Sequence, residues 1–98
     1  MSRSQAAKLV WSPAARTDLV RLRKFVALHN LDAARRAAQS LKKSANLIAE
    51  HPGIGARLES RQDREIFVPF EAQGFIIRYR YDGKTVVILR IWHSLEDR

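Results

Sequence analysis

The sequence predicts an α+β fold with a short N-terminal strand, an antiparallel helical hairpin and then a three-stranded antiparallel sheet. Two observations carry this prediction. Apolar residues recur at helical spacing through the first half of the chain, whereas the second half contains three short strand-like runs separated by turn residues. The length of 98 residues is near the lower limit for an independent hydrophobic core, so we expect a single domain over residues 1–98, with residues 1–8 flexible.

The chain begins with a short strand that is followed by an amphipathic helix. Residues 9–11 form an apolar run, and Ser12 and Pro13 then mark the start of the helix. Ser12 can accept hydrogen bonds from the first free N–H groups, and Pro13 loses nothing at the first helical position because an N–H there would be free anyway. The apolar stripe that extends the helix to about His29 consists of Ala15, Leu19, Leu22, Phe25 and Val26.

A second helix follows after a very short connection, which predicts an antiparallel helical hairpin. Asn30 and Asp32 supply the turn and the cap, and Asp32 stands four residues before Arg36, the favourable order for an ion pair on a helix. The apolar stripe is rich in alanine, so the two helices can approach closely. Its members are Ala34, Ala37, Ala38, Leu41, Ala45 and Ile48.

Three strands are predicted in the second half, over residues 66–70, 74–81 and 85–93. Asp82-Gly83 is typical of a two-residue hairpin turn, which would place Tyr79 opposite Val86. One face of the sheet would then carry Phe75, Ile77, Tyr79, Val86, Ile88, Arg90 and Trp92, and the other Ile76, Arg78, Arg80, Val87, Leu89, Ile91 and His93. We expect helices over one face and a partly filled, basic concavity on the other.

The positive charge is concentrated in the first half of the chain. The whole sequence carries 18 Lys and Arg against 10 Asp and Glu, a net charge of +8. Residues 1–50 account for +7 of this charge and residues 51–98 for +1. Such asymmetry favours an acidic partner for the first half, either a nucleic acid or an acidic polypeptide segment.

The composition excludes several kinds of site. Without cysteine, the chain forms no disulfide, thiolate zinc site or iron–sulfur centre. The histidines His29, His51 and His93 show no metal-ligand spacing, and Gly53-Ile54-Gly55 lacks the context of a phosphate-binding loop. We therefore expect no metal and no cofactor. Because no signal peptide or long apolar run is present, we also expect a cytoplasmic protein without membrane contact.

Two interpretations of the polar residues in the second half remain open. A histidine or tyrosine that moves a proton, together with an arginine that clamps a phosphate, could form a metal-free nuclease site. The candidates are His93, Tyr79, Tyr81, Glu65, Arg64, Arg78, Arg80 and Arg90. The alternative is that these side chains form ion pairs and caps, which is the commoner role of such residues. Trp11 and Trp92 could likewise stack on a base or contact a partner, although their apolar surroundings favour the core.

Several segments, taken in order, resemble the ParE branch of the RelE/ParE toxin superfamily, the toxins of type II toxin–antitoxin pairs. Residues 11–15 with Asp18-Leu19 resemble the opening strand and first helix of that family, and residues 51–55 resemble the loop between helices and sheet. The three strands are represented by Arg64-Glu65, residues 77–80 and residues 89–93. The similarity extends through nearly the whole chain, and it implies the same fold that the residue patterns predict.

The resemblance also implies a function and partners. A ParE-like toxin is expected to inhibit DNA gyrase without catalysis of its own, and to be neutralised by a ParD-like antitoxin that alone contacts operator DNA. The expected antitoxin-binding residues are Arg16, Arg23, Arg35, Arg36, Lys42 and Lys43, and the expected target-binding residues are Arg90, Trp92 and His93. The alternative is a RelE-like ribonuclease that cuts messenger RNA on the ribosome, for which Arg78 and His93 would be the catalytic residues. A third possibility is a simple nucleic-acid-binding module.

Overall fold

The computed structural model describes residues 6–28, 30–59 and 61–96. Residues 1–5, which make up most of the segment expected to be flexible, therefore lie outside the described residues, as does His29. Ala7 and Lys8 are already hydrogen-bonded to Ala49 and Lys84. The elements in chain order are β1 (Lys8–Trp11), α1 (Pro13–Ala27), α2 (Leu31–Glu50), β2 (Ala56–Arg57), β3 (Arg64–Phe70), β4 (Gln73–Tyr81) and β5 (Thr85–His93).

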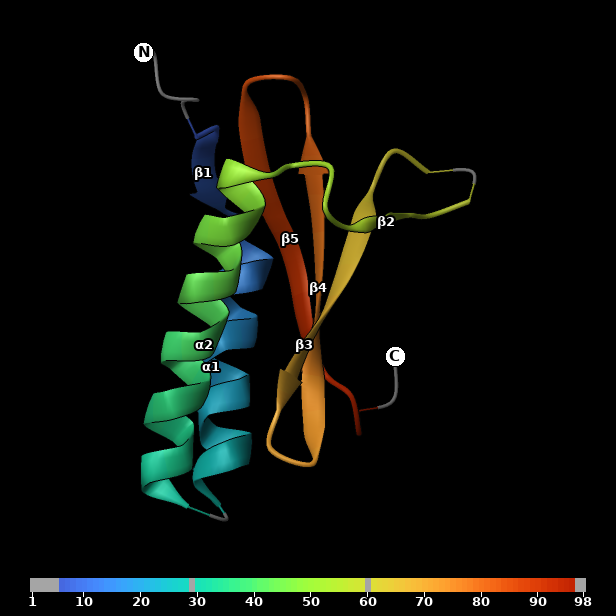
Figure 1. Cartoon of the computed structure of the whole chain (residues 1–98). Coiled ribbons are helices and arrows are strands. Elements are labelled where there is room, and N and C mark those ends of the chain that lie inside the picture. The colour runs from blue at the N-terminus through green and yellow to red at the C-terminus, as the bar shows by residue number, and fades with distance from the viewer. Residues whose placement is uncertain (1–5, 29, 60, 97–98) are drawn as a thin grey trace.

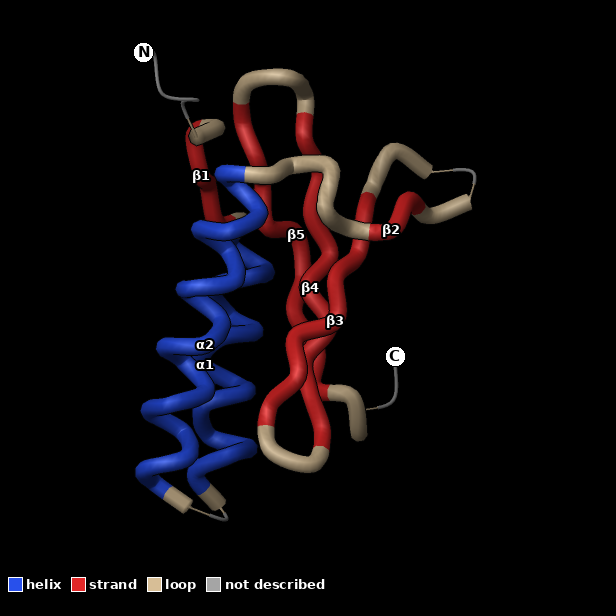
Figure 2. Tube along the Cα trace, viewed as in Figure 1, coloured by secondary structure: helices blue, strands red, loops and turns tan. Residues whose placement is uncertain are grey.

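The two helices form one layer and the strands form a second layer beside it (Figure 1). The strand order is β1-β5-β4-β3-β2, and Figure 2 shows both helices on the same side of this sheet. β1 runs parallel to β5, whereas the other neighbours are antiparallel. The predicted α+β architecture is confirmed. The short strand β2 and the parallel pairing of β1 with β5 were not predicted.

Both helices begin where the sequence predicts. The Ser12 hydroxyl accepts a hydrogen bond from the Ala15 N–H at 3.0 Å, and the Asn30 side chain accepts one from the Ala33 N–H at 3.0 Å. Asp32 lies in the first turn of α2 and pairs with Arg36 at 3.1 Å. The Ser12 and Asn30 side chains satisfy N–H groups that have no partner within the helix, so they fix where each helix starts.

The core lies between the helical layer and one face of the sheet. Alanines at the helix contact keep the backbones close, and larger side chains fill the space over the sheet. The large, almost fully buried apolar side chains are Leu22, Leu41, Ile48, Phe75, Ile77, Tyr79, Val86, Ile88 and Ile91. Burial of each such side chain stabilises the fold by about 1.5–3 kcal/mol relative to an exposed position.

The hairpin turn between β4 and β5 lies one residue later than predicted. Tyr81 pairs with Val86, and the Asp82 N–H donates to the Thr85 carbonyl, so Gly83 and Lys84 are the two loop residues. The Asp82 carboxylate accepts the N–H groups of Lys84 and Thr85 at 2.9 and 2.8 Å. Gly83 has φ +99°, a conformation that favours glycine. The side chain of Asp82 therefore sets the register, and the prediction of Tyr79 opposite Val86 is wrong by two residues.

A β-bulge changes which residues of β5 face the helices. Tyr79 pairs with Ile88 and Arg78 with Arg90, so Leu89 is an extra residue on β5. Because side chains alternate along a strand, one extra residue moves all later side chains to the opposite face. Ile91 and His93 consequently face the core, whereas Arg90 and Trp92 do not. The predicted composition of the two faces is thus correct up to Ile88 and reversed after the bulge.

Tyr79 anchors the loop that connects α2 to the sheet. Its hydroxyl donates to the Pro52 carbonyl at 2.6 Å and accepts from the Gly55 N–H at 2.8 Å. Burial raises the pKa of this phenol, although the hydrogen bond from Gly55 opposes the rise. Gly55 is required here because a Cβ atom would lie 2.8 Å from the Tyr79 hydroxyl and 2.9 Å from the Glu65 carbonyl.

Replacement of Tyr79 by phenylalanine should destabilise the protein by about 1–3 kcal/mol, because it leaves the buried Gly55 N–H without its acceptor. Tyr81→Phe is the matched control, since the exposed Tyr81 hydroxyl donates only to the neighbouring Gly83 carbonyl. Urea denaturation of both variants measures the difference. Equal stabilities for the two variants would contradict the anchoring role of Tyr79.

Candidate functional site

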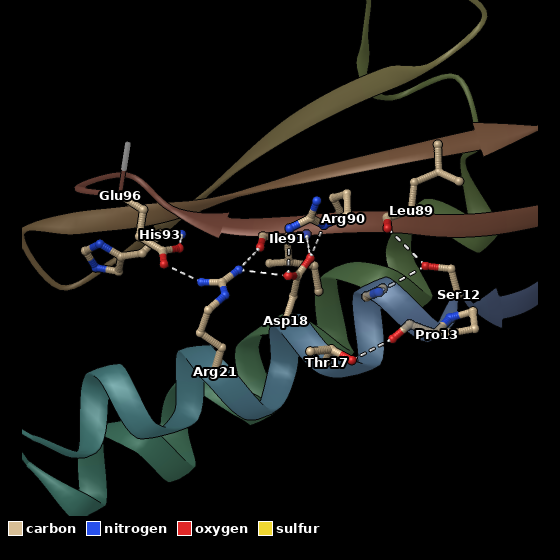
Figure 3. Close-up of polar contacts among 11 residues, drawn as sticks. Ser12, Pro13, Thr17, Asp18, Arg21, Leu89, Arg90, Ile91, His93 and Glu96 are labelled. Atoms are coloured by element: carbon tan, nitrogen blue, oxygen red, sulfur yellow. Dashed lines mark hydrogen bonds and ion pairs between the residues drawn. The ribbon is translucent and has the colours of Figure 1, made fainter. Parts of the chain in front are cut away.

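The outer edge of β5 is closed by side chains of α1 and by the C-terminal turn. β1 ends at Trp11, opposite Ile88, because the chain turns into α1 at Pro13. The rest of the β5 edge therefore has no neighbouring strand, and its N–H and C=O groups need other partners. Figure 3 shows the polar side chains of α1 directed at this edge.

Asp18 is the central residue of this contact. Its carboxylate accepts hydrogen bonds from the Ile91 N–H at 2.8 Å, from the Arg90 Nε at 2.8 Å and from an Arg21 guanidinium nitrogen at 2.9 Å (Figure 3). Only 2% of Asp18 is exposed. Burial alone would raise the pKa of this carboxyl, but the hydrogen bonds from Arg90, Ile91 and Arg21 outweigh burial and lower the pKa. Asp18 is therefore ionised at neutral pH and links a helix, a strand and two cations.

Neighbouring groups complete the edge on both sides of Asp18. The Ser12 hydroxyl donates to the Leu89 carbonyl at 3.0 Å, and Arg21 donates to the Ile91 carbonyl at 2.9 Å (Figure 3). Glu96 accepts the His93 N–H at 2.9 Å and also pairs with Arg21. This network holds the C-terminal turn against α1 and leaves no unpaired stretch on the described part of this edge.

His93 is a buried structural residue in this arrangement. Its ring packs against Phe25 and Phe75, with centroid distances of 5.0 and 5.4 Å, and only 7% of the residue is exposed. Its Nδ1 accepts the Leu95 N–H at 3.1 Å, which requires that nitrogen to be unprotonated. Burial lowers the pKa of the imidazole, although the nearby Glu96 opposes this effect. The geometry therefore favours a neutral ring that faces the core.

Arg78 lies on the other face of the sheet from His93. Arg78 pairs across the strands with Arg90, and its guanidinium bonds Glu65 at 2.6 Å. The two residues expected to be catalytic in a RelE-like site are therefore not brought together. The expected target-binding residues are also divided, because Arg90 and Trp92 share the face of Arg78 whereas His93 does not.

The face of the sheet that the helices leave uncovered is cationic and partly aromatic. We call it the open face, and it contains Glu65, Ile76, Arg78, Arg90 and Trp92. The guanidinium carbons of Arg78 and Arg90 lie 5.0 and 5.3 Å from the Trp92 ring centroid. At these distances both cations interact with the indole ring and cover part of its surface. Trp11, in contrast, packs against the core on the helical side.

The other candidates for a nuclease site have structural partners. Arg64 donates to the Gly55 carbonyl at 2.8 Å, and Arg80 forms a 2.7 Å ion pair with the fully buried Asp63. The Tyr81 hydroxyl donates to Gly83. These contacts agree with the ion-pair and capping interpretation of the sequence.

A groove runs along the surface between α1 and α2. This interhelical groove encloses about 180 Å³ and is lined by apolar side chains with a cation on each rim. The apolar lining comprises Leu19, Val20 and Leu22 of α1 with Ala34, Ala38 and Leu41 of α2. Arg23 borders it on α1 and Lys42 on α2. Because Val20 is 55% exposed, part of this apolar surface is open to solvent.

The six basic residues expected to bind an antitoxin occupy different positions. Arg23 and Lys42 border the interhelical groove, and Arg16 lines an adjoining hollow that also contains Lys42. Arg35 lies two helical turns before Lys42 and therefore on the same side of α2. Arg36 instead pairs with Asp32 and Glu71, and Lys43 borders a neighbouring hollow.

The sequence analysis named Asp18 only within the segment that resembles the toxin family and predicted no structural role for it, although a signal was present. The buried residues of α1 are Ala15, Asp18, Leu22 and Val26, so a carboxylate stands within the apolar stripe of the helix. A charged residue at such a position is buried only when it is paired. Its partners Arg90 and Ile91 are more than 70 residues away and could not be named from sequence.

The described residues contain no group of three or more His, Cys, Asp or Glu side chains that could hold a metal ion. Within the same part of the chain, no helix combines the length and apolar character that a membrane span requires.

This chain is similar in sequence and fold to known proteins. Residues 9–98 match the family described as ParE toxin of type II toxin-antitoxin system, parDE. Toxin RelE3 of Caulobacter vibrioides is 41% identical over 86 residues, which cover 88% of this chain and 92% of that protein. Toxin RelE1 of the same organism is 36% identical over 84 residues, or 86% of this chain and 89% of that protein.

One solved structure is similar along almost its entire length. It is described as a chromosomal ParDE TA system from P. aeruginosa, and the match has a TM-score of 0.71 at 25% sequence identity. The match covers 91% of this chain and 97% of that chain. The similarity therefore includes the helical hairpin as well as the sheet.

Replacement of Asp18 by alanine should destabilise the protein by about 2 kcal/mol, because the buried Ile91 N–H loses its acceptor and the Arg90 guanidinium loses its partner on α1. Asp32→Ala is the matched control, since Asp32 forms an exposed ion pair with Arg36, and its cost should be about 0.5 kcal/mol.

The effect of Asp18→Ala should also depend on pH. The lowered pKa means that ionised Asp18 stabilises the fold above its unfolded-state pKa, and that this contribution is lost as the pH falls through the folded-state pKa.

Urea denaturation of both variants and the wild type at pH 7 and at pH 2.5 measures these differences. The gap between wild type and Asp18→Ala should be smaller at the lower pH. A gap that is independent of pH, or a cost no larger than that of Asp32→Ala, would contradict the role given to the ionised carboxylate.

Proposed function

Because the chain belongs to the ParE toxin family of type II toxin–antitoxin systems, we propose that it inhibits DNA gyrase and is neutralised by direct binding of a ParD-like antitoxin. Growth arrest would follow from blocked gyrase, and the site of action would be the cytoplasm. The toxin would contact operator DNA only through the antitoxin. The single observation that carries the antitoxin part of this proposal is the interhelical groove with its cationic rims.

The groove fits an acidic amphipathic segment. Its apolar lining can bury side chains of a helix or an extended chain, and such anchors supply most of the affinity in complexes of this kind. Arg23 and Lys42 stand on opposite rims, so acidic residues on both sides of the bound segment would find partners. Opposite charge mainly accelerates association and selects the partner.

Inhibition without catalysis is supported by the placement of the candidate catalytic residues. Arg78 and His93 lie on opposite faces of the sheet, and the His93 ring is buried with its Nδ1 already bonded to Leu95. A general acid–base pair must converge on one bond of the substrate.

One observation favours the alternative, ribosome-dependent cleavage of messenger RNA. The open face carries Arg78 and Arg90 beside Trp92, and such a surface could contact phosphates and bases.

Purified toxin should inhibit DNA supercoiling by gyrase at concentrations comparable to that of the enzyme, because a non-catalytic inhibitor acts by binding. The measurement is a supercoiling assay with increasing toxin, run in parallel with a translation assay that detects cleavage of ribosome-bound messages. Toxin mixed beforehand with its antitoxin is the control and should be inactive in both. Intact supercoiling together with cleaved messages would overturn the gyrase proposal and establish the ribonuclease alternative.

Reversal of the two rim charges, Arg23→Glu with Lys42→Glu, should slow association with the antitoxin roughly tenfold at low salt, because the groove would repel an acidic segment. The matched control is Lys24→Glu with Arg57→Glu, which changes the net charge equally at two exposed positions that do not line the groove. Stopped-flow association rates at two salt concentrations measure the effect. Equal slowing by both pairs would mean that only net charge matters and that the groove is not the docking site.

A further inference from the structure

The sheet has one outer strand whose free edge borders the groove. β1 stands at the end of the strand order, with β5 on one side, and Figure 1 shows it at the margin of the sheet. At the opposite end of the sheet, less of the β3 edge is available to a further strand. β2 already pairs with the first residues of β3, and Pro69 has no N–H to donate. The β1 edge is not protected by either device.

Two hydrogen bonds establish which backbone groups of β1 point outward. The Lys8 N–H donates to the Lys84 carbonyl at 3.0 Å, and the Ser12 N–H donates to the Ile88 carbonyl at 3.0 Å. Backbone groups of successive strand residues point to alternate sides, so Lys8, Val10 and Ser12 face β5. The N–H and C=O groups of Leu9 and Trp11 therefore point away from the sheet.

These outward groups have no hydrogen-bond partner within the part of the chain that the structure describes. The backbone of Ala7 also points away from β5, but its N–H has a partner. It donates to the Ala49 carbonyl, near the end of α2, at 2.8 Å. The available edge thus begins at Leu9, just beyond the end of α2. An unpaired strand edge of this kind is a template for another strand.

The free edge is continuous with the interhelical groove. A hollow of about 370 Å³ lies beside it and is lined by Leu9, Trp11, Arg16, Leu19, Lys42 and Asn46. Leu19 and Lys42 also line the interhelical groove, so the two spaces adjoin. A chain that leaves the groove at Lys42 therefore reaches the outer edge of β1 directly.

We propose that an extended, acidic segment of the antitoxin pairs with the outer edge of β1 and adds a strand to the sheet. This inference rests on the proposed function and extends it from the groove to the strand edge. Backbone hydrogen bonds to Leu9 and Trp11 fix the register of the segment, and side chains on one of its faces enter the adjoining hollow. The groove and the edge together hold one continuous segment.

Charge identifies the occupant as acidic. Lys8, Arg16 and Lys42 surround the edge and the hollow, and none of them forms an ion pair with a described residue. A second copy of this chain paired through the same edge would bring these cations against one another, which is unfavourable. An acidic antitoxin segment would neutralise them.

Amide hydrogen exchange, measured by NMR on the free toxin and on its complex with the full-length product of the adjacent antitoxin gene, tests the pairing directly. The Leu9 and Trp11 amides should exchange rapidly in the free toxin and at least tenfold more slowly in the complex. Val10, which faces β5, should be protected in both samples and serves as the internal control. Binding without added protection at Leu9 and Trp11 would overturn the strand pairing while leaving the proposed function intact.

Two other outcomes of the same experiment are also decisive. Failure of the antitoxin to bind would overturn the proposed function and the strand pairing together. Protection of Leu9 and Trp11 that appears in the free toxin as its concentration rises would identify a second copy as the occupant, and would overturn the assignment to the antitoxin.

A pair of substitutions at Leu9 gives independent evidence. Leu9→Pro removes the outward N–H and leaves the backbone hydrogen bonds between β1 and β5 intact. Edge strands accept proline where the lost N–H faces solvent. Leu9→Ala removes the same apolar contacts but keeps the N–H. The proline variant should bind the antitoxin roughly fivefold to tenfold more weakly than the alanine variant, with thermal denaturation used to verify that both are folded. Equal affinities would contradict the pairing, and the exchange measurement on the wild type still decides the question if the proline variant does not fold.

Discussion

The buried carboxylate of Asp18 completes a sheet edge that the chain itself leaves unfinished. β1 is four residues long because the chain turns into α1 at Ser12-Pro13, so the second half of β5 has no strand beside it. Asp18 supplies the missing acceptor at Ile91, and Arg21 supplies a donor to the Ile91 carbonyl. The same helix that shortens β1 therefore replaces it along β5. Together with the apolar core, this contact holds α1 against the unpaired part of β5.

The β-bulge at Leu89 lies at the same contact between β5 and the start of α1. The Leu89 carbonyl bonds the Ser12 hydroxyl, and the extra residue turns Ile91 and His93 toward the core. Arg90 then starts on the open face and reaches around the strand edge to Asp18, while its guanidinium remains near Trp92. One irregularity in β5 thus decides that the histidine is structural and that the cations gather on the opposite face.

Local signals in the sequence predicted most of the fold. Ser12 and Asn30 cap the helices as expected, because capping depends only on residues within one turn. The register of the hairpin was missed because the side chain of Asp82 competes with the two-residue turn that Asp-Gly usually forms. The parallel pairing of β1 with β5 was also missed, since it joins segments about 77 residues apart without a local signal. Among the site residues, helical spacing correctly placed Arg23 and Lys42 outside the apolar stripes of the helices, whereas the burial of His93 could not be predicted without knowledge of the bulge.

Native-state hydrogen exchange at the Ile91 amide is the most direct measurement of the role of Asp18. Exchange should be compared between the wild type and Asp18→Ala, with the Ile77 amide of the neighbouring strand β4 as the reference for global unfolding. If Asp18 closes the β5 edge, the substitution will accelerate exchange at Ile91 roughly tenfold or more beyond its effect at Ile77. Equal acceleration at both amides would show that the edge stays closed without the carboxylate and would contradict this account.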